Sequence, residues 1–300
     1  MVKKDDLIIK PTSDLFMASL YSAPKNEPIL RSMLSGVMIN SGQPPVVRAT
    51  VLNPLNIQDY PTDKEYRLDV WVEDSMRAFY NVELQREKHT NFCERMLYYW
   101  GGKYGTQLER GHPYTLLRPV RSIIITEFPI FPLLKQLHAV FELRSRENPE
   151  VCFSDHCQMH VLRLGDLIRN NLVGLDQFGS DLRYWMKFWA LGEKLEENEM
   201  SAMLQDCPPV YSAYEEFNRF RSDPVMREKV RAREWFLDEQ QLVIAGARAE
   251  GLAEGEAKGE AKGRKAERIE VAQNLKRLGA SLAMIAEATG LPLSEIERLN

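Results

Sequence analysis

Two carboxylates, Asp69 and Glu83, lie on neighbouring runs of alternating apolar and polar residues. The apolar positions of these runs are Leu68, Val70 and Val72, then Tyr80, Val82 and Leu84. Alternation of this kind predicts two half-buried strands. A turn near Ser75–Met76 would place Asp69 almost directly across from Glu83 on one face. Like charges destabilise an antiparallel pair at such positions. The two groups therefore need a cation between them, or one must stay protonated; a divalent metal is our first hypothesis.

The chain before this hairpin is predicted to begin with helices. Apolar residues at helical spacing between residues 11 and 40 predict two helices with a break at Pro24. Asp14 lies near the start of the first helix, where capping is the structural role of a carboxylate. Residues 41–66 are rich in proline and contain one predicted strand, Val46–Leu52.

The chain after the hairpin is predicted to add a helix and more strands. Asn91 and Glu94 have the spacing of a capping box and would open a helix that runs to about Gln107. Arg95 and Lys103 would project away from its aromatic side. The predicted strands that follow are Val120–Phe128, Ala139–Leu143 and Met159–Leu167.

The sequence predicts three parts. Residues 1–245 would form one domain with a helical extension from about residue 180. Residues 246–265 repeat glycine every four positions among charged residues, which predicts a marginal helix acting as a linker. Residues 266–300 have the helix, turn and helix spacing of a helix-turn-helix.

The role of the last part is open between DNA reading and self-association. Residues 258–277 carry seven Lys or Arg against three Glu, a modest basic stripe. The expected recognition helix, however, holds Glu295 and Glu297 against only Arg298, which disfavours closeness to phosphates. A packing module that joins copies of the chain fits these residues equally well.

Composition limits the classes of function. The net charge of −4 excludes a uniformly basic nucleic-acid binder. The sequence contains no run resembling a signal peptide or a membrane span, so we expect a cytoplasmic protein. Four cysteines in 300 residues do not make a disulfide framework and are expected to be reduced thiols.

The order of these features resembles the PD-(D/E)XK nuclease superfamily, and more narrowly its transposase-type family, related to recombination-promoting nucleases. The resemblance covers roughly residues 8–245. The matching segments are Pro11-Thr-Ser-Asp14-Leu-Phe, Leu68-Asp69-Val, Val82-Glu83-Leu-Gln85, and Arg95 through Tyr98-Tyr99. It implies an α/β fold with a restriction-endonuclease-like core, a mixed central sheet flanked by helices, to which the C-terminal helices are added.

The resemblance also implies roles for individual residues. Asp69 and Glu83 would be metal ligands, together with the carbonyl of Leu84, and Asp14 would assist from the first helix. Oxygen ligands of this kind suit Mg²⁺ or Mn²⁺. The implied function is a metal-dependent DNA endonuclease tied to transposition or recombination, acting on double-stranded DNA.

This sequence departs from the wider superfamily at Gln85, where most members have lysine, although the narrower family commonly carries glutamine. An amide can orient water or substrate, but it cannot act as a base or add positive charge. Arg86, Lys88 or Arg95 could supply that charge, and Lys103 is a further candidate for DNA contact. The alternative function is a catalytically inactive DNA-binding or assembly protein derived from a mobile element.

A rival metal site is suggested by closely spaced soft ligands at Cys152, His156, Cys157 and His160. Zinc prefers such ligands. The spacing does not match a paired C-x₂-C pattern, and Cys157 and His160 straddle the start of a predicted strand. We therefore expect scattered core and surface residues here rather than a zinc site.

Overall fold

The computed structural model describes residues 7–53, 70–88, 90–195 and 197–299. Its centre is a six-stranded sheet with the order β1-β2-β3-β4-β6-β5. The strands are β1 (Ala49–Val51), β2 (Val70–Asp74), β3 (Phe79–Gln85), β4 (Val120–Thr126), β5 (His138–Arg144) and β6 (Cys152–Leu162).

The sheet is mixed, and its register determines which side chains share a face. β2 and β3 form the predicted antiparallel hairpin, with Val70 opposite Val82. β3 and β4 are parallel, with Glu83 opposite Ile124. β4 pairs parallel with β6, and β6 pairs antiparallel with β5. Since residues opposite each other point to the same side, Glu83 and Ile124 lie on one face.

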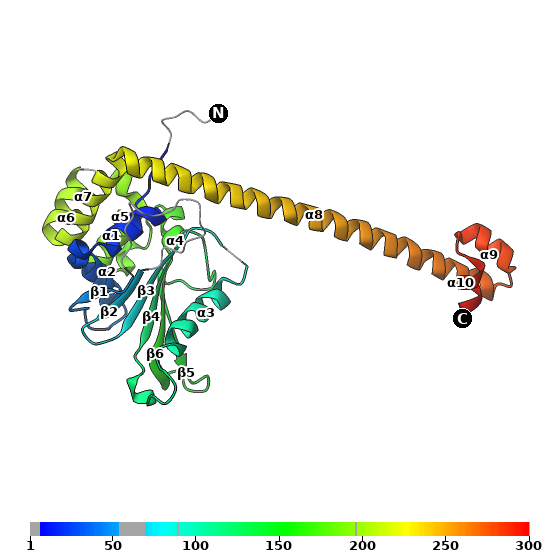
Figure 1. Cartoon of the computed structure of the whole chain (residues 1–300), viewed down its shortest axis with the longest axis horizontal. Helices are drawn as coiled ribbons and strands as arrows, with labels where there is room; N and C mark the ends of the chain where they lie inside the picture. The colour runs from blue at the N-terminus through cyan, green and yellow to red at the C-terminus, as the bar shows by residue number, and fades with distance from the viewer. Residues whose placement is uncertain (1–6, 54–69, 89, 196, 300) are drawn as a thin grey trace. The chain divides into compact units, whose positions relative to one another are not determined.

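Helices cover both faces of the sheet (Figure 1). The larger core joins one face to the helices α1 (Asp14–Ser22), α2 (Glu27–Asn40), α4 (Leu164–Arg169), α5 (Ser180–Leu191) and α7 (Pro208–Ser222). A smaller core joins the other face to α3 (Phe92–Gly105). This arrangement confirms the predicted mixed sheet flanked by helices, and it leaves Glu83 on the side of α3.

The remaining helices are α6 (Glu197–Asp206), α8 (Pro224–Arg277), α9 (Leu282–Thr289) and α10 (Leu293–Arg298). Contacts divide the chain into two units, residues 1–233 and 234–300. In the second unit, α9 and α10 pack on the end of α8 around Ala272, Ile285, Leu291 and Ile296. α8 continues as a helix through residues 246–265. The domain boundary at residue 245 and the linker role of residues 246–265 stay predictions.

The structure corrects two local predictions. The strand predicted at Met159–Leu167 starts at Cys152 and ends at Leu162, after which α4 begins. Its first five residues are exposed or half-buried, so they lack the apolar pattern that identified the rest. Asn91 precedes α3 as predicted, but it has φ of 60° and its side chain makes no capping hydrogen bond.

Gly165, in α4, allows that helix to approach the backbone after β4. A Cβ at this position would lie 2.2 Å from the carbonyl oxygen of Glu127, closer than any real contact. We expect Gly165→Ala to lower the free energy of unfolding by about 2 kcal/mol, because the backbone must shift. Urea unfolding measures this, with Gly102→Ala as the control. Gly102 is on an exposed part of α3 with nothing within 4 Å of an added Cβ. An equal loss in both variants would contradict the explanation.

Candidate active site

Glu83 is a buried carboxylate near the end of β3. Tyr80, Val82 and Leu84 belong to or pack on the larger core, so strand alternation turns Glu83 toward α3. Only 2% of its surface is exposed. Burying a carboxylate is costly unless it is hydrogen-bonded or paired, so its partners are informative.

Two amides on the same face of β3 hold this carboxylate. Asn81 Nδ2 donates to Glu83 Oε1 at 2.6 Å, and Gln85 Nε2 donates to Glu83 Oε2 at 3.0 Å. An ionised carboxylate only accepts hydrogen bonds, which fixes the orientation of both amides. The oxygen of each amide is therefore turned away from Glu83.

Arg95 of α3 completes a chain of contacts to Glu83. Its Nη2 donates to Gln85 Oε1, so Gln85 connects a guanidinium to the buried carboxylate. The prediction left three basic residues as candidates beside Gln85, and the structure places Arg95 against it. Charge-assisted bonds of this kind are stronger than neutral ones, and they hold Gln85 in one orientation.

Three buried polar atoms around this group have no hydrogen-bond partner among the described residues. They are Asn81 Oδ1, Arg95 Nε and Thr126 Oγ1. Thr126 lies opposite Gln85 on β4. Buried polar groups are normally paired, so one acceptor, one donor and one hydroxyl remain available for a ligand. Asn81 and Thr126 were not predicted as site residues; the signal for Asn81 was its place two residues before Glu83 on the same strand face.

Asp69, the predicted partner of Glu83, lies outside the described residues. The described register of the hairpin starts one residue later, with Val70 opposite Val82. The Leu84 side chain packs against the larger core, and the role of its carbonyl as a ligand stays a prediction. Among the described residues, no group of three or more His, Cys, Asp or Glu side chains converges on a metal position.

Asp14 starts α1, as predicted, and forms an ion pair. Its Oδ2 accepts from Arg233 Nε at 3.1 Å, and its Oδ1 accepts from the Leu15 backbone N–H at 2.8 Å. Arg233 is itself buried. These contacts give Asp14 a clear structural role, while its assistance to catalysis stays a prediction.

The remaining candidates for DNA contact differ in exposure. Lys88 is exposed and Arg86 is half-buried. Lys103 places its ammonium 5.0 Å from the ring centroids of both Trp71 and Phe79. Cation–π contacts at such distances stabilise the folded chain, so Lys103 has a structural function on this face. Contact with DNA stays a prediction for all three.

A shallow pocket lies beside Arg95 at the start of α3. Its lining consists of Thr90, Asn91, Glu94, Arg95, Tyr98 and Tyr99. The Tyr98 side chain is exposed. The pocket therefore combines a guanidinium with an exposed aromatic ring close to the Glu83 group.

The cysteines and histidines of β6 do not converge. Cys152 is exposed, Cys157 is buried, and all four cysteines of the chain are free thiols. His156 bonds Tyr104 at 2.9 Å through Nδ1, while His160 Nδ1 is 3.1 Å from His138 Nε2. These separate partners agree with the expectation of scattered residues rather than a zinc site.

The buried pair His138 and His160 predicts acid sensitivity. Burial lowers the pKa of His138 to about 4 and that of His160 to about 3, whereas both titrate near 6.5 when unfolded. The unfolded chain therefore binds more protons as pH falls from about 6.5 to 4, and stability is lost over that window. We expect each histidine to contribute about 2 kcal/mol less stability at pH 5 than at pH 7, or about 4 kcal/mol for the pair. Urea unfolding of a His138→Gln, His160→Gln variant should show a smaller loss, whereas exposed His112→Gln should behave like the wild type.

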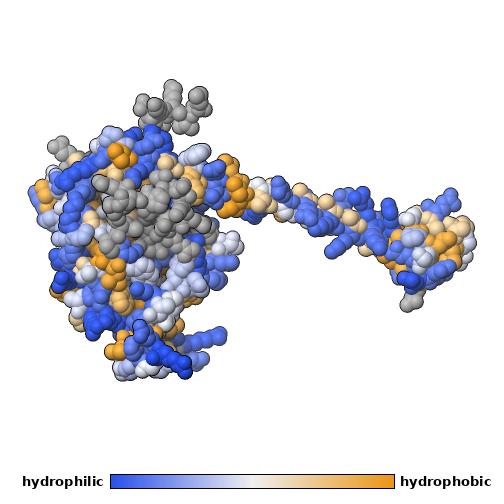
Figure 2. Space-filling model, in the orientation of Figure 1, coloured by the Kyte–Doolittle hydropathy of each residue, from blue (hydrophilic) through white to orange (hydrophobic). Residues whose placement is uncertain are grey.

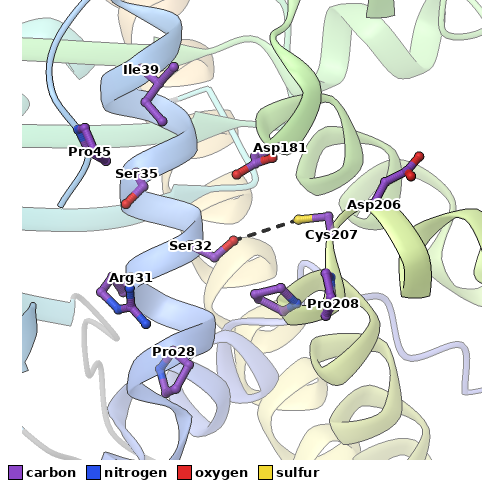
Figure 3. A pocket seen from close by; sticks show the side chains of 11 residues that line it. Pro28, Arg31, Ser32, Ser35, Ile39, Pro45, Asp181, Asp206, Cys207 and Pro208 are labelled. Atoms are coloured by element: carbon purple, nitrogen blue, oxygen red, sulfur yellow. Dashed lines mark hydrogen bonds between the residues drawn. The ribbon is translucent and has the colours of Figure 1, made fainter. Parts of the chain in front are cut away.

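Another pocket, of about 290 Å³, lies between α2, α5 and α7 (Figure 3). Ser32 Oγ and Cys207 Sγ face each other across it at 3.9 Å. Burial raises the pKa of the Cys207 thiol, which disfavours the reactive thiolate. None of its lining residues belongs to the Glu83 group.

No helix among the described residues combines the length and apolar content needed to cross a membrane. A family model described as PD-(D/E)XK nuclease family transposase matches residues 11–247. Neither the comparison with curated proteins nor that with solved structures gave a significant match. The matched range contains the whole sheet and every residue of the Glu83 group.

Proposed function

Because the chain belongs to the PD-(D/E)XK nuclease family of transposases, we propose that it is a metal-dependent DNA endonuclease that acts in transposition or recombination. The observation that carries this proposal is the buried Glu83 carboxylate. Two amides orient it, and Arg95 is joined to it through Gln85. A buried carboxylate held in one orientation by neighbouring side chains is what a metal-binding group requires.

The residues on this face fit a hard divalent cation. Mg²⁺ commonly takes one or two carboxylates and completes its shell with water. Glu83 supplies one carboxylate, whose orientation Asn81 and Gln85 fix. Asp69, one residue before the described register of β2, would supply the second, with the Leu84 carbonyl between them. A Mg²⁺ or Mn²⁺ ion held there would activate a water molecule and stabilise the charge on the scissile phosphate.

The protein side chains would position the reacting groups. Asn81 and Gln85 hold Glu83 in one orientation, which avoids reorganisation during the reaction. Gln85 cannot accept a proton as a base, so its role is to orient. Arg95 adds the positive charge that an anionic phosphate requires. Asp14 is the auxiliary carboxylate of this proposal.

The pocket beside Arg95 is the proposed entry of the DNA backbone. Arg and Lys side chains neutralise phosphates, and exposed aromatic rings can stack on bases. Arg86, Lys88 and Lys103 would extend the contact. We place this activity in the cytoplasm, where the free cysteines of the chain would stay reduced.

Plasmid nicking tests the proposed function. Purified protein is incubated with supercoiled plasmid and Mg²⁺ or Mn²⁺, with EDTA added to a parallel sample. We expect nicked and linear DNA only when the metal is present, and none from Asp69→Ala. Equal nicking by both proteins, or no nicking by either, would overturn the catalytic proposal.

The alternative function is an inactive DNA-binding or assembly protein. Calorimetric titration with Mn²⁺ distinguishes it from the proposed nuclease by measuring whether the chain binds the metal. A saturable site that is lost in Glu83→Ala supports the metal centre. Absence of any site in the wild type would favour the alternative. The proposed homo-oligomer through the C-terminal helices is compatible with either function.

A further inference from the structure

The long helix α8 exposes one continuous stretch on all sides. Every side chain from Leu242 to Arg268 is exposed. Large apolar side chains lie in the first part of this stretch or shortly before it and are between 59% and 73% exposed: Trp235, Leu242, Val243, Ile244 and Leu252. Figure 2 shows this apolar surface on the first part of the stretch, followed by a mostly hydrophilic part. A stable helix normally buries an apolar face.

The sequence of this stretch does not favour an isolated helix. Glycine occurs at residues 246, 251, 255, 259 and 263, and each glycine weakens a helix relative to alanine. Most helical stability in proteins comes from packing of one face against a neighbour. The exposed stretch therefore requires a packing partner. The distribution of its charges indicates what kind of partner that is.

Charge changes sign near the middle of the stretch. Residues 234–256 carry six carboxylates and one base, Arg248. Residues 258–277 carry seven bases and three carboxylates. The change falls at residue 257. An antiparallel copy of the same helix would set each acidic half against a basic half, whereas a parallel copy would oppose like charges.

We propose that a second copy of this chain packs antiparallel along residues 242–272 of α8, with the two helices crossing near Ala257. Glu250 would then lie near Arg264 of the second copy, and Glu256 near its Lys258. Leu252 would lie near Lys262 of the second copy, and the apolar side chains at residues 242–244 would lie near its residues 270–272, which include the exposed Val271. This inference is independent of the proposed nuclease function.

The ion pairs inside the helix are compatible with such pairing. Glu254 pairs with Lys258, and Glu260 with Arg264, each four residues apart. All four side chains remain at least 63% exposed. Exposed pairs of this kind contribute little by themselves, so these charges can also face a second helix. A dimer held by them should weaken as salt rises.

Charge reversal in the full chain tests the orientation. One variant changes Glu250, Glu254 and Glu256 to Lys, a second changes Lys258, Lys262 and Arg264 to Glu, and a third combines both sets. Sedimentation velocity should show a dimer for the wild type, at least a tenfold weaker dimer for each single set, and recovery in the combined variant. Circular dichroism confirms that each variant keeps its helix. In a parallel dimer, like charges would oppose each other both in the wild type and in each single-set variant. The dimer affinity would then be the same in all of them.

Cysteine cross-linking locates the crossing point. In a background with Cys93 and Cys152 replaced by serine, Ala257→Cys should form a disulfide-linked dimer under mild oxidation, and Ala245→Cys should not. A parallel pair would cross-link at both positions. A wild-type chain that stays monomeric in solution would overturn the proposal, and so would one whose α8 becomes helical only when DNA is bound. Equal cross-linking at both positions, or no rescue by the combined reversal, would overturn the antiparallel arrangement.

Discussion

Replacement of Glu83 by glutamine is expected to lower plasmid nicking at least about a thousandfold, which corresponds to roughly 4 kcal/mol of transition-state stabilisation. The carboxylate accepts hydrogen bonds from both Asn81 and Gln85. A glutamine amide cannot accept both in the same way, since one of its positions is itself a donor. It also removes the negative charge that would hold a divalent cation. The rate of conversion of supercoiled to nicked plasmid measures the effect.

The matched control is Glu87→Gln, four residues further along the chain. Glu87 is exposed, so the same chemical change there is expected to alter nicking by less than about threefold. Thermal unfolding of both variants separates loss of the site from loss of the fold. A folded Glu83→Gln protein that nicks at the wild-type rate would contradict the assignment of Glu83.

The sequence was informative about the sheet because periodicity reports burial directly. The alternation of Leu68, Val70 and Val72 with Tyr80, Val82 and Leu84 predicted the hairpin, and the described register, with Val70 opposite Val82, agrees with it. The apolar run after Val120 predicted a central strand, and β4 lies between β3 and β6. Where burial is partial, as at the start of β6, the same pattern is absent, and the first residues of that strand were not predicted.

The contacts of the site could not be predicted in this way. That Arg95 reaches Gln85 depends on how α3 packs over the sheet through Phe92 and Met96, and spacing along the chain does not contain that information. The left-handed backbone at Asn91 likewise replaced a capping box that the sequence favoured. Arg233 lies more than two hundred residues from Asp14, so their pairing was not visible either.

The link between Arg95 and Gln85 leads to the second large expectation. Arg95→Gln should lower nicking about a hundredfold, or roughly 3 kcal/mol, because it removes the positive charge that Gln85 joins to Glu83. It also frees Gln85 to rotate, so that Glu83 loses a fixed donor. Arg95→Lys keeps the charge without the planar donor geometry and should lose less. Exposed Arg110→Gln removes an equal charge elsewhere and should have little effect.

Exchange of the two side chains tests whether Arg95 replaces the missing lysine. Gln85→Lys alone would set an ammonium beside the Arg95 guanidinium, and like charges at hydrogen-bond distance repel, so activity should fall. The combined Gln85→Lys, Arg95→Gln variant restores one positive charge next to Glu83. Its nicking activity should be at least tenfold higher than that of Arg95→Gln alone. Additive losses in the combined variant would mean that the two positions act separately. The charge of Arg95 would then serve DNA binding rather than the reacting group, and the salt dependence of DNA affinity, measured on the same variants, would show it.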